Sequence, residues 1–340
     1  MLTSIKTDIM IIKGLKMEAL IQNKFGKPEE VFLTQKMRKP QPKENEVLIK
    51  TLLSPLHHHD LSAAKGLYGQ FRPFPIISGS EAVGIVEACG KQVTDFKIGQ
   101  RVITASGAGT WAEYFTAPAD SVFPVSEGLK AEQAAQLAAM PLSALLLLNF
   151  LEVQKGDWII QNGANGVIGK ILGALAKARG IHVVNLVRSA KASAELKKAG
   201  AEYIVETSAK DWKAQAKEIA GDMLKAGIDV LGGEASGNLV ELLGNDSLLV
   251  SFGQIACGEM KIPSGPLILK SITLKGFYVT PVLNKMSKGE KIKILEELEA
   301  LILAGKLSLP VESIHDLDHF QEALTAHNQQ GRAGRVLLKV

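Results

Sequence analysis

A glycine-rich turn is the clearest candidate for chemistry in this sequence. Gly163, Gly166 and Gly169 are spaced as G-x-x-G-x-x-G between a predicted strand, "WIIQNG", and a predicted helix, "VIGKILGALAKARG". Glycines in such a turn let the backbone bend sharply and approach a pyrophosphate, while N–H groups at the helix start face the anion. In this strand–turn–helix context the pattern predicts a dinucleotide-binding site.

The second predicted strand ends at an arginine. The acid that binds the ribose 2′-hydroxyl of NAD is expected about 20 residues beyond the turn. At that place "NLVRSAK" has Arg188 and no carboxylate. A guanidinium can form two charge-assisted hydrogen bonds with a 2′-phosphate, so the stretch favours NADPH. The alternative is an arginine that only ends the strand at the surface.

Alternating strands and helices must position this turn. The strand "HVVNLV", the helix "SAELKKAG" and the strand "EYIVET" follow it, and the alternation continues to "SLLVSFG". This order predicts right-handed βαβ units in a doubly wound parallel sheet, the Rossmann arrangement of an α/β fold. We assign residues 136–280 to this NADPH-binding domain.

The flanking segments have a different pattern. Residues 17–135 hold short β-branched segments separated by Gly and Pro, which predicts a compact, mostly antiparallel β domain. The strand "GRVLLKV" lies outside the alternating block, so we expect residues 281–340 to return to this domain. Met17 resembles a natural start, and residues 1–16 are expected to form an unstructured extension.

Composition limits the classes of function. Of the 340 residues, 46% are hydrophobic and 22% charged, and 39 basic against 35 acidic residues give a net charge of +4. These values fit a globular protein and give no nucleic-acid footprint. Cys89 and Cys257 are the two cysteines, which fits a reducing compartment. No apolar run approaches a membrane span or a secretory signal, so we expect a cytoplasmic protein without a membrane partner.

Several longer motifs extend the comparison to a known family. The chain resembles the zinc-independent branch of the medium-chain dehydrogenase/reductase superfamily, and within it the mitochondrial-type 2-enoyl thioester reductases and the quinone oxidoreductases. The resemblance implies a GroES-like catalytic domain beside the Rossmann domain. The motifs are "GLYGQFRPFPIISGSEAVGIVEACG", "GTWAEY", "GDWIIQNGANGVIG", "LGGEASGNLVELL", "LLVSFGQ" and "LILKSITLKGFYVT".

The resemblance implies roles for individual residues. Tyr68 in "GLY" matches the catalytic tyrosine, and His57 replaces an asparagine of an N-x-x-D motif beside the nicotinamide. Met140 replaces another family asparagine, and a second phosphate-binding arginine after Arg188 is missing. The remaining cofactor matches are Asn165, Gly166, Val167 and Ile168 at the pyrophosphate, and Phe252, Gly253, Gln254, Phe277 and Tyr278 beside the nicotinamide.

A metal site is not expected. Ser80 occupies the position that resembles a zinc-ligating histidine of the related alcohol dehydrogenases. Residues 57–59 are all histidines, but in an extended segment neighbouring side chains point to opposite faces and would not converge on one ion. We expect His57 to face the cofactor and Asp60 to hold a neighbouring backbone.

Other candidates have two interpretations each. Trp111 could shape a substrate pocket or belong to the core. Ser143 could reach the nicotinamide ribose or cap the apolar helix that it begins. Glu81 and Glu113 are isolated acids in β segments, and we assign them no catalytic role.

These observations lead to a reaction class. Without a metal, hydride delivery from NADPH suits an electron-poor π system, either a 2-enoyl thioester or a quinone. The phenol of Tyr68 is protonated at neutral pH, because its reference pKa is about 10, and can donate the proton. The alternatives are an NADPH:quinone oxidoreductase with little acid catalysis and a non-catalytic NADPH-binding protein. The apolar segment "ITLKGFYV" would need a partner at a sheet edge, and in the resembled family it pairs in a dimer, so we expect a homodimer.

Overall fold

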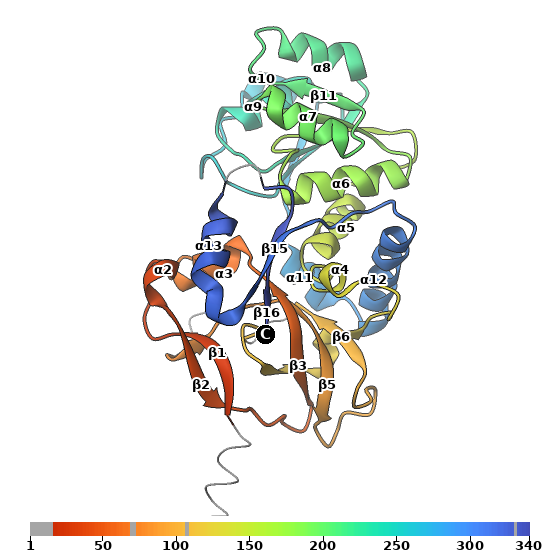
Figure 1. The fold of residues 1–340 in the computed structure, drawn as a ribbon. Coiled ribbons are helices and arrows are strands. Elements are labelled where there is room, and N and C mark those ends of the chain that lie inside the picture. The colour runs from red at the N-terminus through yellow and green to blue at the C-terminus, as the bar shows by residue number, and fades with distance from the viewer. Residues whose placement is uncertain (1–15, 69–72, 106–108, 330–331) are drawn as a thin grey trace, which may run out of the picture. The chain divides into compact units, whose positions relative to one another are not determined.

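The structure, a computed structural model, describes residues 16–68, 73–105, 109–329 and 332–340 (Figure 1). The chain forms two compact units, Met1–Ala139 with Leu309–Val340, and Met140–Ser308. The return to the first unit therefore comes at 309 and not at 281. The reason is that α11 (Val279–Lys285) and α12 (Lys288–Leu303) pack against α5 (Met140–Phe150) of the second unit. Apart from Lys16, the expected extension lies outside the described residues.

The first unit is built from two sheets. Their strand pairs are antiparallel except for one parallel pair, which confirms the mostly antiparallel β domain. The C-terminal strand β16 (Arg335–Lys339) pairs with β3 (Glu46–Pro55), so the chain end does return here. The first sheet has the order β2 (Phe32–Arg38), β1 (Lys16–Gln22), β4 (Ile76–Ile77). The second has the order β15 (Val311–Asp316), β16, β3, β5 (Ala82–Cys89), β6 (Arg101–Thr104), β8 (Val122–Pro124), and β7 (Tyr114–Pro118) also pairs with β3.

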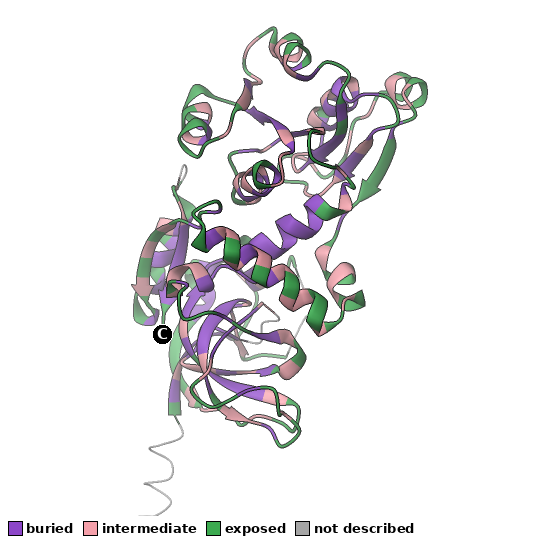
Figure 2. Cartoon of the chain, turned by 90° about the vertical axis from the view of Figure 1, so that its right-hand side faces the viewer, coloured by how far each residue is buried: buried purple, intermediate pink, exposed green. Residues whose placement is uncertain are grey.

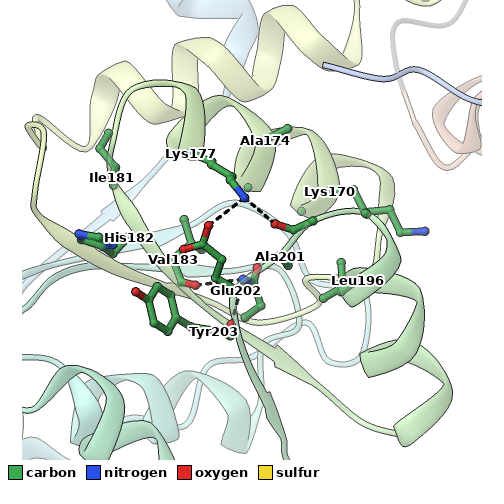
Figure 3. Close-up of a pocket in the computed structure, with 15 residues that line it drawn as sticks. Lys170, Ala174, Lys177, Ile181, His182, Val183, Leu196, Ala201, Glu202 and Tyr203 are labelled. Carbon is green, nitrogen blue, oxygen red and sulfur yellow. Dashed lines mark hydrogen bonds and ion pairs between the residues drawn. The ribbon is translucent and has the colours of Figure 1, made fainter. Parts of the chain in front are cut away.

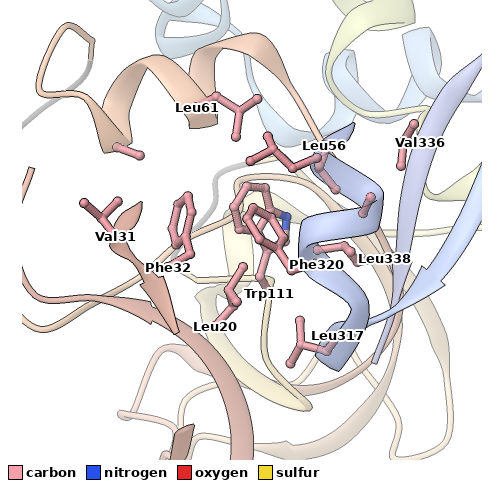
Figure 4. Packing of buried hydrophobic residues seen from close by; sticks show 13 residues of the cluster. Leu20, Val31, Phe32, Leu56, Leu61, Trp111, Leu317, Phe320, Val336 and Leu338 are labelled. Carbon is pink, nitrogen blue, oxygen red and sulfur yellow. The ribbon is translucent and has the colours of Figure 1, made fainter. Parts of the chain in front are cut away.

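Trp111 lies in the apolar core of this unit and not on a pocket wall. Its side chain is 0% exposed, and its ring lies 5.4 Å from that of Phe32 and 5.5 Å from that of Phe320 (Figure 4). Its Nε1 donates to the backbone oxygen of Pro55 at 3.4 Å. The expected pocket role is therefore corrected, because helix α13 (Phe320–Asn328), far along the chain, covers the indole.

The second unit contains a six-stranded sheet in which all pairs are parallel. The order confirms the predicted doubly wound Rossmann fold, with β9 and β12 adjacent where the strand order reverses. Strand β14 lies at one edge. The strands in order are β11 (Tyr203–Glu206), β10 (His182–Val187), β9 (Trp158–Gln161), β12 (Leu224–Asp229), β13 (Leu248–Ser251) and β14 (Thr273–Gly276). The helices between them are α6 (Val167–Ala178), α7 (Ala190–Lys198), α8 (Trp212–Ala220), α9 (Glu234–Leu242) and α10 (Ser264–Leu269).

Helix α5 has no polar face. Its residues from Pro141 to Leu148 are all buried, as expected for its run of leucines (Figure 2). Ser143 lies within this helix and not at its start, so the capping interpretation is wrong. None of the helices in the described part of the chain is long and apolar enough to cross a membrane.

Candidate active site

The glycine turn has the geometry that a pyrophosphate requires. Gly163, two residues after the end of β9, has a φ of +59°, which a residue with a side chain rarely adopts. A Cβ on Gly169 would lie 2.5 Å from the backbone oxygen of Ala164, so only glycine lets α6 pack this closely. Asn165, Gly166 and Val167 are exposed at the tip. The N–H groups of the first turn of α6 therefore border an accessible surface.

An amide side chain fastens this turn to the neighbouring strand. Asn162 donates from Nδ2 to Oδ1 of Asp229 at 2.7 Å and accepts at Oδ1 from the backbone of Val230 at 2.8 Å. Asp229 is fully buried and also accepts from the hydroxyl of Ser236. Sequence reasoning overlooked Asp229, although the motif "GDWIIQNGANGVIG" contains its partner Asn162.

Arg188 lies at the same edge of the sheet as the turn. The parallel register pairs Asn185 of β10 with Gln161 of β9, so the two strands end side by side. Arg188 is exposed directly after β10, and Ser189 caps α7 by accepting from the backbone of Ala192 at 3.4 Å. A guanidinium beside the glycine turn is placed where a ribose phosphate of the same dinucleotide would lie.

The segments after β13 and β14 reach this edge as well. The amide of Phe252 donates to the backbone oxygen of Asp229 at 2.8 Å, and that of Phe277 donates to the backbone oxygen of Ser251 at 3.0 Å. Phe277 is buried, with its ring 6.0 Å from that of Phe252, whereas Tyr278 is 58% exposed. Gly253 and Gln254 complete the segment. The carboxyl ends of parallel strands thus gather most of the expected cofactor residues; buried Ser143, on α5, is not among them.

A separate pocket in this unit lies away from that edge. It lies between α6, α7 and the first residues of β10 and β11, among them His182 and Tyr203 (Figure 3). Lys177 crosses it, donating to the backbone of Gly200 at 3.0 Å and pairing with Glu202 at 2.8 Å. Because it is at the amino ends of these strands, it is not the dinucleotide site.

In the first unit, Tyr68 and the three histidines are neighbours. Tyr68 follows helix α3 (His58–Ala64) and is 47% exposed. Its ring lies 5.8 Å from that of His59, and the ring of His59 stacks on that of His57 at 4.7 Å. The rings of residues 57 and 59 therefore lie on the same side, and a helix begins at His58 where we expected an extended segment.

His57 is bound to a carboxyl group and covered by protein. Its Nε2 lies 2.7 Å from Oε2 of Glu81, and both side chains are at most 2% exposed. Oε1 of Glu81 accepts from the backbone of Ala139 at 2.7 Å. Burial lowers the pKa of His57 well below its usual value and raises that of Glu81 to about 8, so both favour their neutral forms. The expectation that His57 faces the cofactor does not fit this burial, and Glu81 was overlooked because its partner is distant in sequence.

A second polar group adjoins this pair. Nε2 of His59 lies 2.7 Å from Oγ of Ser80, and Ser80 is also hydrogen-bonded to the carboxyl of Asp60. Asp60 accepts from the backbone of His57, as predicted for this aspartate. Glu113 has a structural contact, accepting from the backbone of Glu18 at 2.7 Å. Among the described residues no group of three or more His, Cys, Asp or Glu is arranged to hold a metal ion.

Comparisons with known proteins give the family. The models for an alcohol dehydrogenase GroES-like domain and for a zinc-binding dehydrogenase match residues 43–127 and 167–332. A mitochondrial enoyl-[acyl-carrier-protein] reductase from Caenorhabditis elegans is 30% identical, over 82% of each chain. The chain belongs to the zinc-independent branch of the medium-chain dehydrogenase/reductase superfamily. Like the enoyl reductases and quinone oxidoreductases to which it is similar, it is an oxidoreductase.

Solved structures of the superfamily agree with this assignment. A mycobacterial quinone oxidoreductase is 26% identical, with a TM-score of 0.87 over 95% of this chain and all (100%) of that one. An enoyl thioester reductase from Candida tropicalis shares the fold, with a TM-score of 0.83, 23% identity and coverage of 96% and 100%. The medium-chain reductase fold thus extends over nearly the whole chain.

Proposed function

We propose that this protein is an NADPH-dependent reductase that saturates the activated C=C bond of a 2-enoyl thioester or a related conjugated carbonyl. The observation that carries the proposal is the likeness over most of both chains to an enoyl-[acyl-carrier-protein] reductase. The nucleotide edge supports it, since the glycine turn and Arg188 form a site suited to a dinucleotide with a 2′-phosphate. A mycobacterial neighbour with 26% identity is complexed with NADPH.

The chain's own residues would hold the cofactor and supply the proton. NADPH, when bound, supplies the hydride. The turn at Gly163–Gly169 would bind its pyrophosphate and Arg188 its 2′-phosphate, while the segments at Phe252 and Phe277 would border the nicotinamide. Tyr68 would donate its phenolic proton to the α carbon, since its side chain is accessible.

The test is NADPH oxidation with crotonyl-CoA, a longer 2-enoyl-CoA and 1,4-benzoquinone. Thioester turnover that falls by about 100-fold or more in Tyr68→Phe, with NADPH affinity unchanged, is expected for a lost general acid. Tyr203→Phe is the matched control, because this tyrosine lies on β11 of the other unit. Full thioester turnover by Tyr68→Phe would contradict the donor role.

A quinone is the second candidate substrate. The mycobacterial quinone oxidoreductase named above supports it, with 26% identity over 95% of this chain. Turnover of benzoquinone alone, unaffected by Tyr68→Phe, would establish this alternative. NADPH binding without any turnover would establish a non-catalytic role.

We further infer a homodimer formed through strand β14. This strand is at the edge of the parallel sheet, and all four of its residues are exposed. Leu274 and Tyr278 add apolar surface, with 44% and 58% exposure. An unpaired edge with exposed apolar side chains is well suited to pair with a second copy.

The compartment stays a prediction. The low cysteine count suggested the cytoplasm, whereas relatives such as the human and the Caenorhabditis elegans enzymes are mitochondrial by name. Fractionation of cells that produce the full chain would separate the two locations.

A further inference from the structure

His59 is accessible to a ligand, whereas His57 is covered by protein. Its side chain is 28% exposed, and its ring lies between those of His57 and Tyr68. Its Nε2 contacts the Ser80 hydroxyl at 2.7 Å and lies 3.6 Å from Oδ1 of Asp60. The polar contacts therefore continue from the neighbour of Tyr68 to a buried carboxyl group.

We propose that His59, Ser80 and Asp60 form a proton relay that restores the phenolic proton of Tyr68 after each turnover. The proposal rests on the proposed function, because it assigns a role to residues that would act after Tyr68 has donated its proton. His59 would contact Tyr68 directly or through water, whereas Ser80 and Asp60 would act through His59.

The far end of the relay has an unsatisfied atom. Asp60 is 7% exposed, and no described residue is a hydrogen-bond partner of its Oδ2. A buried carboxylate oxygen without a partner is costly, whereas a protonated carboxyl carries less charge to be solvated. The geometry therefore suits a carboxyl group that holds a proton.

The surrounding charges agree with this assignment. Burial raises the pKa of Asp60 to about 7, with Glu81 adding to the increase and Ser80, His57 and Arg335 opposing it. Burial, His57, Arg335 and His58 lower the pKa of His59 to about 3. Near neutral pH the imidazole is thus uncharged, and Asp60 is the member of the group that gains or loses a proton.

The relay balances as a series of proton shifts. Hydride addition to the β carbon leaves an enolate; its α carbon forms a C–H bond with the proton of Tyr68, and the Tyr68 O–H bond breaks. The tyrosinate then takes the Nδ1 proton of His59, Nε2 takes the hydroxyl proton of Ser80, and Ser80 takes the carboxyl proton of Asp60. Water finally returns a proton to Asp60, so NADPH is oxidised, the substrate is reduced and one solvent proton is consumed.

The decisive measurement compares the first turnover with later ones in stopped flow, with the full-length protein, NADPH and crotonyl-CoA. In Ser80→Ala, Tyr68 begins protonated, so one equivalent of NADPH should be oxidised at the wild-type rate. Later turnovers should be slower by about 10- to 100-fold, with a larger solvent deuterium isotope effect. Ser80→Thr keeps a hydroxyl and should restore steady turnover.

A second contact between a histidine and a serine provides the control. Nε2 of His315 lies 2.9 Å from Oγ of Ser313 on β15, so Ser313→Ala removes a similar contact outside the proposed relay. Equal slowing of all turnovers in Ser80→Ala, or slowing of none, would overturn the relay. Failure of the wild-type protein to oxidise NADPH with any thioester would instead refute the proposed function.

Wild-type protein gives a second measurement that does not depend on a variant. Asp60 loses its proton as pH rises through about 7, so above that pH it should no longer supply a proton to Tyr68 through the relay. At pH 6 we therefore expect steady oxidation of NADPH, whereas at pH 8.5 we expect a rapid oxidation of one equivalent of NADPH per enzyme followed by a slower phase. Steady turnover without a burst at the higher pH would contradict Asp60 as the source.

Discussion

Nε2 of His57 lies 2.7 Å from Oε2 of Glu81, in a place where neither side chain is more than 2% exposed. Two ionisable groups this deep are poorly solvated as an ion pair, and both pKa directions favour the uncharged forms. The pair can therefore hold α3 to the segment before β5 without burying net charge.

The variant Glu81→Gln tests whether Glu81 is uncharged in the folded protein, through the pH dependence of the free energy of unfolding. A carboxyl whose pKa rises to about 8 on folding stabilises the protein below its usual pKa, and this contribution is lost as pH rises toward 8. The lowered pKa values of His57 and His59 act in the opposite sense, so the contribution of Glu81 is measured by urea unfolding as the difference between the wild type and Glu81→Gln. From pH 5 to pH 8 the free energy of unfolding of the wild type should fall relative to that of the variant by about 1–3 kcal/mol.

Glu87→Gln is the control for that experiment. Glu87 is also on β5 but lies at the surface, where it pairs with Lys39 at 2.7 Å. Its removal should leave the pH slope unchanged. Identical slopes for Glu81→Gln and the wild type would show that Glu81 is ionised in the fold.

Gly169→Ala should damage the nucleotide site. The new methyl would meet the oxygen of Ala164 at 2.5 Å, so the turn must shift, at a cost of about 1–3 kcal/mol in unfolding free energy. NADPH affinity, measured by cofactor fluorescence, should fall with it.

Gly173→Ala on the same helix is the opposite case. A methyl there would meet its nearest atom at 3.8 Å, an ordinary contact. This variant should bind NADPH normally and gain about 0.5–1 kcal/mol of stability, since alanine favours a helix. Equal behaviour of the two variants would mean that the close approach at Gly169 is unimportant.

Arg188→Ala should change cofactor choice. Loss of charge-assisted hydrogen bonds to a 2′-phosphate is expected to weaken the binding of NADPH by about 10- to 100-fold and to leave the binding of NADH almost unaffected. Titration calorimetry with both cofactors measures the difference. Lys198→Ala, at the exposed end of α7, controls for lost surface charge. An equal loss of affinity for both cofactors would argue against recognition of the 2′-phosphate by Arg188.

Leu274→Arg should separate the proposed dimer. Leu274 is on the edge strand β14, and an arginine there would bring like charges together across a pairing of two copies. Light scattering should give about twice the 36.5 kDa of the chain for the wild type and the single value for the variant. Leu303→Arg, at the exposed end of α12, should stay dimeric.

The nucleotide edge was predictable because its signals are local. The strand, turn and helix around Gly163 are contiguous, and parallel strands necessarily place their carboxyl ends together. The environment of His57 was not predictable in this way. Its partner, Glu81, is 24 residues away, and a helix begins at His58 where we expected an extended segment. Trp111 could not be assigned either, because Phe320 covers it from the far end of the chain.

The first unit is discontinuous, whereas residues 140–308 form the second without interruption. During synthesis the second unit is therefore complete before the first has its last strand. Until β16 emerges, β3 lacks one pairing partner and the indole of Trp111 lacks the cover of α13. A ribosome that stalls within the final 32 residues, from Leu309 to Val340, would thus release an assembled nucleotide unit joined to an open β domain, a form suited to capture by chaperones.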